Sequence, residues 1–77
     1  MSKVTVDQII EIIEKAHLVK DANALTHDKP LSEQGVDPLD FSGVLFNIEE
    51  VLDIEIPDED IDRLQTINNI VIYINNK

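Results

Sequence analysis

The chain is predicted to be all-α, a small bundle of four helices in which the third is short. Apolar residues recur at three- and four-residue steps in separate segments. Capping residues, and in one case a proline, stand where these segments begin. Hydrophobic residues make up 43% of the chain, most of them aliphatic, and no cysteine is present to form a disulfide. An aliphatic core between helices must therefore stabilise the fold, and residues 1–77 are expected to form one domain.

The first helix is expected over residues 6–18. Charged residues such as Glu11 and Glu14 separate its apolar positions, which is the pattern of an amphipathic helix. Thr5 is the expected N-cap, and Asp7 lies in the first turn, where a negative charge favours the helix dipole. The apolar positions are Val6, Ile9, Ile10, Ile13, Ala16 and His17.

Residues 20–37 are expected to form a long loop. The segment is rich in Asp, Asn, Ser, Pro and Gly and shows no sustained periodicity. Loops of this length are uncommon in compact domains and often serve function. Leu25 and Leu31 are its large apolar residues, and we expect them to attach the loop to the core.

The second helix has the clearest start in the chain. Asp37 is the expected N-cap, Pro38 suits the first helical position, and Asp40 supports the first turn. A wide apolar stripe follows, made of Leu39, Phe41, Val44, Leu45, Ile48, Val51 and Leu52. Gly43 interrupts the helix and weakens it by about 1 kcal/mol relative to alanine. We interpret this glycine as a tolerated substitution and not as a sign of close packing.

Two further helical segments are expected after Pro57. Residues 58–64 have apolar residues three apart and predict a short helical turn, whereas Thr66 caps a final helix. Its apolar positions are Ile67, Ile70, Val71 and Ile74. Residues 70–74 are β-branched or aromatic and locally favour a strand. The cap and the spacing favour a helix, and propensity is the weaker guide.

The charge of the chain limits its partners. Sixteen acidic residues face six basic ones, for a net charge of −10. Such a surface repels nucleic acid and anionic membranes and attracts basic proteins. Residues 31–62 hold eleven acidic residues and no basic one. With no signal peptide and no membrane-spanning segment in the sequence, we expect a cytoplasmic protein without membrane insertion.

The sequence offers no catalytic or metal-binding pattern. Its serines lie outside any nucleophile motif, and His17 and His27 suit surface or capping positions. A calcium loop beginning at Asp58 would need glycine at its sixth position and glutamate at its twelfth, where the chain has Arg63 and Asn69. We therefore expect no enzyme activity and no metal site.

Three segments of the chain match a known sequence pattern. Residues 35–40, Gly-Val-Asp-Pro-Leu-Asp, are similar to the motif Gly-x-Asp-Ser-Leu-Asp/Glu, and the family that this motif resembles is that of the acyl carrier proteins. Residues 48–59 resemble the end of the family's second helix and its following loop, and residues 66–74 its last helix. The resemblance covers nearly the whole chain. It implies a four-helix bundle with a long first loop and a short third helix.

The resemblance also implies a changed attachment site. Family members carry acyl or peptidyl groups on 4′-phosphopantetheine, which is esterified to the serine of the motif. Pro38 stands at that position and has no hydroxyl group to esterify. Ser42 is the alternative hydroxyl, but it lies about 6 Å further along the helix. We therefore expect no cofactor, and 4′-phosphopantetheine only where a variant site is used.

Other roles are implied by position in the family pattern. Asp37, Asp40, Glu49 and Glu50 match acidic positions that dock on basic partner enzymes, and Leu39 and Phe46 match apolar contact positions. Ile56, Ile61 and Ile70 match positions that line an acyl cavity.

Two functional hypotheses follow from the resemblance. The first is a monomeric domain that cannot be loaded and acts through protein–protein interaction of its acidic second helix. The alternative is a working acyl or peptidyl carrier with a variant attachment site. Such a carrier would serve fatty-acid, polyketide or nonribosomal peptide synthesis, or another branch of lipid or secondary-metabolite biosynthesis.

Overall fold

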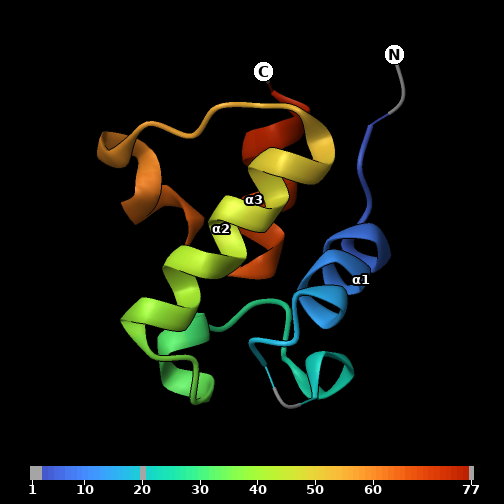
Figure 1. Cartoon of the computed structure of the whole chain (residues 1–77), viewed down its shortest axis with the longest axis vertical. Helices are drawn as coiled ribbons and strands as arrows, with labels where there is room; N and C mark the ends of the chain where they lie inside the picture. The colour runs from blue at the N-terminus through green and yellow to red at the C-terminus, as the bar shows by residue number, and fades with distance from the viewer. Residues whose placement is uncertain (1–2, 20, 77) are drawn as a thin grey trace.

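The computed structural model describes residues 3–19 and 21–76, and these ranges contain helices and no strand. Three α-helices, α1 (Val6–Ala16), α2 (Pro38–Leu52) and α3 (Ile67–Asn75), pack around one core (Figure 1). Three 3₁₀ segments complete the fold: η1 (Ala22–Ala24), η2 (Leu31–Gln34) and η3 (Asp58–Leu64). The predicted all-α bundle is confirmed, with η3 as its short third helix. None of the helices in the described ranges is long and apolar enough to cross a membrane.

Helix α1 begins with a complete capping box. The Thr5 hydroxyl accepts the N–H of Gln8 at 3.2 Å, and the Gln8 side chain accepts the N–H of Thr5 at 2.9 Å. The helix ends earlier than predicted, because His17 adopts a left-handed conformation (φ 57°) as the C-cap. His17 is exposed, so placing it on the apolar face was wrong, whereas Ile12, which the expected stripe left out, is buried.

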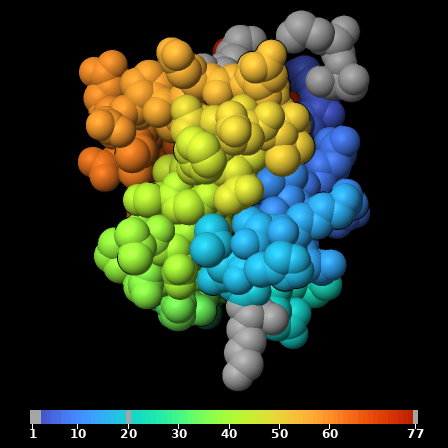
Figure 2. All heavy atoms as spheres, viewed as in Figure 1, coloured from blue at the N-terminus to red at the C-terminus, as the bar shows by residue number. Residues whose placement is uncertain are grey.

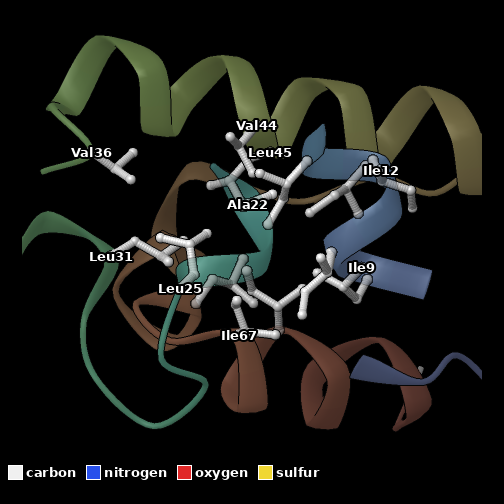
Figure 3. Close-up of a cluster of buried hydrophobic side chains, with 14 of the residues drawn as sticks. Ile9, Ile12, Ala22, Leu25, Leu31, Val36, Val44, Leu45 and Ile67 are labelled. Atoms are coloured by element: carbon white, nitrogen blue, oxygen red, sulfur yellow. The ribbon is translucent and has the colours of Figure 1, made fainter. Parts of the chain in front are cut away.

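The core is an aliphatic cluster between the three α-helices (Figure 3). Ile9 and Ile13 from α1, Val44 and Ile48 from α2, and Ile70 from α3 are all inaccessible to solvent. No buried polar or charged residue interrupts the cluster within the described chain. Apolar burial of this kind is the main stabilising term available to a small domain without disulfides.

The long first loop is held against the bundle at several points. Leu25 and Leu31 are buried, which confirms their predicted role. The backbone N–H of Leu31 donates to the carbonyl of Gln65 at 2.8 Å, and the N–H of Asn68 donates to the carbonyl of His27 at 3.0 Å. These bonds join the loop to the beginning of α3. The loop is therefore a packed part of the structure, with η1 and η2 inside it.

Gly43 allows the segment after α1 to pack closely on α2. A Cβ atom built at Gly43 would lie 2.5 Å from Cδ1 of Leu18. The interpretation of this glycine as a tolerated substitution was therefore wrong, because Leu18 occupies the space that a larger side chain would need. In Figure 2 the end of α1 lies directly beside the first half of α2.

Two contacts hold α3 in place. The side chain of Asn75 accepts the N–H of Val4 at 2.8 Å and donates to its carbonyl at 3.1 Å. The phenol of Tyr73 donates to the carboxylate of Asp60 in η3 at 2.6 Å. The first contact joins the two ends of the described chain, and the second joins α3 to η3. Thr66 caps the helix as predicted, accepting the N–H of Asn69 at 3.0 Å.

Candidate docking surface and attachment position

The beginning of α2 is built as the sequence predicts. Asp37 is the N-cap, and its carboxylate accepts the backbone N–H of Asp40 at 2.9 Å. Pro38 follows at the first helical position, where its missing N–H leaves no helical hydrogen bond unmade. Asp37, Pro38 and Leu39 are all exposed. Pro38, which the sequence resemblance matches to the family's serine, is therefore accessible, but its side chain is a saturated ring.

The residues predicted to bind partners lie along α2, on the surface shown from green to yellow in Figure 2. Asp37 and Glu50 are exposed, whereas Asp40 and Glu49 are half-buried. The side chains of Leu39 and Phe46 are 82% and 61% exposed, so neither is buried in the core. Acidic and apolar side chains are thus presented together on this helix. That combination is typical of a protein-binding surface with apolar anchors among charges.

Glu49 makes a contact that the sequence did not indicate. One carboxylate oxygen accepts the backbone N–H of Ile56 at 2.9 Å, in a partly buried position. Glu49 therefore fastens the loop after α2 to the helix itself. Asp53, the C-cap of α2, starts that loop in a left-handed conformation (φ 54°). The loop turns back beside α2 instead of extending away from it.

A groove of about 240 Å³ lies between α2 and η3. Leu45 and Phe46 line it from α2, and Ile56 and Ile61 line it from the following segment. Its polar lining consists of Ser42, Glu49 and Asp58. Ile56 and Ile61, predicted to line an acyl cavity, thus meet at one site. Ile70 is fully buried in the core and does not line this groove.

A wider groove of about 550 Å³ lies between η3 and α3. Arg63, Ile72 and Tyr73 line it together with Asn69 and Asn76. The hydrogen bond from Tyr73 to Asp60 raises the pKa of the phenol above 10.0, with burial and the charge of Asp60 adding to the shift. This groove opens beside α3 and shares no lining residue with the groove beside α2.

The sequence alone missed two features of this surface. Val51 and Leu39 were both placed on the apolar stripe of α2, but they are 63% and 82% exposed. The stripe is wider than the part of α2 that packs against α1 and η2, so its outermost positions face solvent. The groove itself depends on the loop fastened by Glu49. The spacing of apolar residues in the sequence could not predict that the Glu49 side chain binds the backbone N–H of Ile56, seven residues further on.

The described residues show no arrangement suited to metal chemistry. No three of their His, Asp or Glu side chains converge to hold a metal ion. The acidic segment that begins at Asp58 forms η3.

Taken together, these features describe a small helical domain whose second helix begins at an exposed position and carries exposed acidic and apolar side chains. The family model for the phosphopantetheine attachment site matches residues 7–74. The chain belongs to this family, that of the acyl carrier proteins. Members of the family are carriers and not enzymes, and the chain is accordingly a non-enzymatic domain.

Acyl carrier proteins from several bacteria are similar to the chain over most of their length. The acyl carrier protein of Buchnera aphidicola subsp. Schizaphis graminum is 39% identical over 70 residues, which cover 91% of this chain and 89% of the relative. That of Exiguobacterium sp. is 32% identical, with 95% and 98% covered. That of Clostridium perfringens strain SM101 is 32% identical, with 88% and 90% covered. No solved structure gives a significant match.

Proposed function

We propose that this chain is an acyl-carrier-protein-like domain that is not loaded at the usual position and that acts by binding basic partner proteins through α2. Pro38 is the observation that carries the proposal. The family's prosthetic group is attached through a serine hydroxyl, and Pro38 holds the matching position at the beginning of α2. A pyrrolidine ring offers no oxygen for a phosphodiester, so the residues present do not fit the group.

The local structure supports loss of loading without loss of fold. Pro38 is at the helix position where proline is best tolerated, and the Asp37 cap is intact. The surface around it remains exposed and acidic. Proline at position 38 removes the hydroxyl needed for attachment but leaves α2 folded. A domain that acts only by binding partners needs α2 and does not need the hydroxyl.

The charge supports basic partners. The eleven acidic residues of segment 31–62 include every acidic residue of α2, and no cation lies among them in the sequence. A positively charged partner surface would be steered to this helix, with an encounter rate that falls as salt is added.

Loading is tested by the intact mass of the purified chain before and after incubation with coenzyme A and a broad-specificity phosphopantetheinyl transferase. Pro38→Ser restores the hydroxyl and serves as the positive control. We expect the added mass only in Pro38→Ser. An added mass in the unmodified chain would contradict the proposal.

The alternative, a working carrier with a variant site, rests on Ser42. This serine is exposed on α2, one turn after Pro38, and lines the groove. The same mass measurement decides between the two functions, because modification at Ser42 would be seen in fragment masses and abolished by Ser42→Ala.

Docking is tested separately, by the affinity of the chain for the same transferase and for other enzymes that bind carrier proteins. Asp40→Lys and Glu50→Lys should weaken binding by about tenfold or more, since each reverses a charge at the interface. Asp21→Lys makes the same charge change outside α2 and should have a smaller effect. If all three variants weakened binding equally, the net charge of the chain and not the surface of α2 would determine the affinity, which would contradict the proposed role of α2.

A further inference from the structure

Helix α3 is uncharged in a strongly acidic chain. The chain has a net charge of −10, and acidic residues lie in α1, α2 and η3. Residues 67–76 contain no charged residue, so α3 is the one α-helix of the described chain without a charge. Two copies of such a chain repel one another over most of their surface. The repulsion is least where α3 of one copy faces α3 of the other.

Four residues form a stripe along one side of this helix, which we call the α3 stripe. Asn69, Ile72, Tyr73 and Asn76 are related by steps of three and four residues, and all four line the groove of about 550 Å³ between η3 and α3. Ile72 is 57% exposed, and both asparagines are exposed. Tyr73 is half-buried, with its phenol bonded to Asp60. The stripe thus offers apolar surface whose burial would be favourable.

The order of residues in the α3 stripe is symmetrical. Polar Asn69 and Asn76 lie at its two ends, at equal distances in sequence from the midpoint between Ile72 and Tyr73. In an antiparallel pair of α3 helices with a two-fold axis at this midpoint, Asn69 of each copy lies opposite Asn76 of the other. Ile72 of each copy then lies opposite Tyr73 of the other. The surface is therefore complementary to itself, as a two-fold dimer interface must be.

The two asparagines have the hydrogen-bonding groups that such a pairing requires. Within the described chain, the side-chain amide of Asn69 makes no hydrogen bond. The side-chain nitrogen of Asn76 donates to the carbonyl of Ile72 at 2.9 Å, and its side-chain oxygen accepts no bond from a described residue. An amide both donates and accepts. The nitrogen of Asn69 in one copy can therefore donate to the oxygen of Asn76 in the other.

We propose that the α3 stripe is the contact surface of a dimer, in which Ile72 of each copy enters the groove between η3 and α3 of the other. The occupant is a second copy of this chain because the stripe is uncharged, symmetrical and able to pair with its own amides. A charged partner would find Arg63 as the one charged residue that lines the groove within the described chain.

The dimer is expected to be weak. One short helix buries less surface than a stable interface needs, so we expect a Kd on the order of 0.1 mM. The monomer expected from the sequence is then the form present in dilute solution. The inference is independent of the proposed function, because α3 lies behind α2 in Figure 1 and its groove shares no lining residue with the groove beside α2.

The molar mass of the full chain is measured by sedimentation equilibrium from roughly 10 μM to 1 mM, at low and at high salt. We expect it to rise from 8.7 kDa toward twice that value. Added salt should strengthen the association because it screens the repulsion between two acidic chains, whereas it should weaken docking of a basic partner on α2. A mass that stays at 8.7 kDa throughout, or an association that salt weakens, overturns the inference and leaves docking on α2 intact.

A matched pair of single variants locates the interface. Ile72→Asp places a charge without a partner in the contact and should weaken association at least tenfold. Val51→Asp makes a similar change at a side chain that is 63% exposed on α2 and should have a smaller effect. Equal weakening by the two variants would attribute the effect to net charge and overturn the inference. Circular dichroism confirms that both variants are folded.

A pair of double variants tests the antiparallel register. Asn69→Glu with Asn76→Lys keeps the net charge and places each new glutamate opposite a new lysine of the other copy, so association should tighten by about fivefold. Asn69→Lys with Asn76→Lys places lysine opposite lysine and should weaken association, although it makes the whole chain less acidic. Equal affinity of the two double variants, or tighter association of the second, overturns this dimer.

Discussion

Glu49 and Ile56 are joined by a hydrogen bond of 2.9 Å between a helix side chain and the backbone of the loop that follows. The bond gives Glu49 a structural role besides the docking role that the family pattern implies. Substitutions at Glu49 therefore report on two effects, whereas Glu50 is exposed and reports on surface charge alone.

Glu49→Ala should lower the free energy of unfolding by about 1 kcal/mol, because the N–H of Ile56 loses its acceptor in a partly buried place. Glu49→Gln retains an acceptor oxygen and should lose less. Hydrogen exchange at the Ile56 amide measures the effect directly and should accelerate in Glu49→Ala. Glu50→Ala is the matched control, and equal exchange in both alanine variants would refute the structural role.

Gly43 and Leu18 should be energetically coupled. Alanine at position 43 would gain about 1 kcal/mol of helix propensity in a helix interior, but it must displace the Leu18 side chain. We expect Gly43→Ala to gain little or nothing in the unmodified chain, and to stabilise by about 1 kcal/mol in a Leu18→Ala background. Urea denaturation of the four chains of this cycle measures the coupling. Identical effects in both backgrounds would show that Leu18 moves aside freely.

Tyr73 should make the protein less stable at alkaline pH. Its pKa is raised in the folded state, mainly by its hydrogen bond to Asp60, so the folded chain holds the phenol proton more tightly than the unfolded chain. The stabilising contribution is thus fully present below pH 10.0 and is lost as pH rises through the folded-state pKa. Melting temperatures of the unmodified chain and of Tyr73→Phe should converge above that range.

The same group can be titrated directly, since Tyr73 is the single tyrosine of the chain and no tryptophan obscures its absorbance. Asp60→Asn removes the carboxylate and should lower the tyrosine pKa toward 10.0. A tyrosine titration unchanged by Asp60→Asn would show that this hydrogen bond is not the cause.

Pro38→Ser should fold but be less stable, by about 0.4–1 kcal/mol, because proline restricts the unfolded chain at a position whose conformation suits it. Thermal or urea unfolding of the two chains measures the difference. A more stable Pro38→Ser would mean that the ring strains the beginning of α2. The measurement also supports the loading assay, which requires that its positive control be folded.

The helices could be predicted because their signals are local. Thr5, Asp37 and Thr66 each cap a helix as expected, and apolar spacing identified most of the core. The strand tendency of residues 70–74 was overridden by packing, as α3 buries Ile67 and Ile70. The C-terminal end of α1 was harder to predict. Its C-cap, His17, has a left-handed backbone conformation, and histidine does not mark a helix end in a sequence as clearly as glycine does.

The groove and the packing at Gly43 could not be predicted in the same way. Both depend on which segments meet in space, and the residues involved are separated by seven positions in one case and twenty-five in the other. Motif similarity located Pro38, Leu39 and Phe46 on the surface of α2 because the family pattern is aligned with the helix itself. Contacts across the bundle leave no comparable trace in a single chain.

The side chain of Asn75 hydrogen-bonds both backbone groups of Val4, which holds the beginning of the described chain against the end of α3. Because residues 4 and 75 are adjacent, a chain in which a short linker joins them and a new break is opened in the exposed part of the first loop, between Asp28 and Lys29, should fold as a circularly permuted domain with α2 undisturbed. Such a domain would show that the surface of the bundle does not depend on the order in which its helices follow one another along the chain.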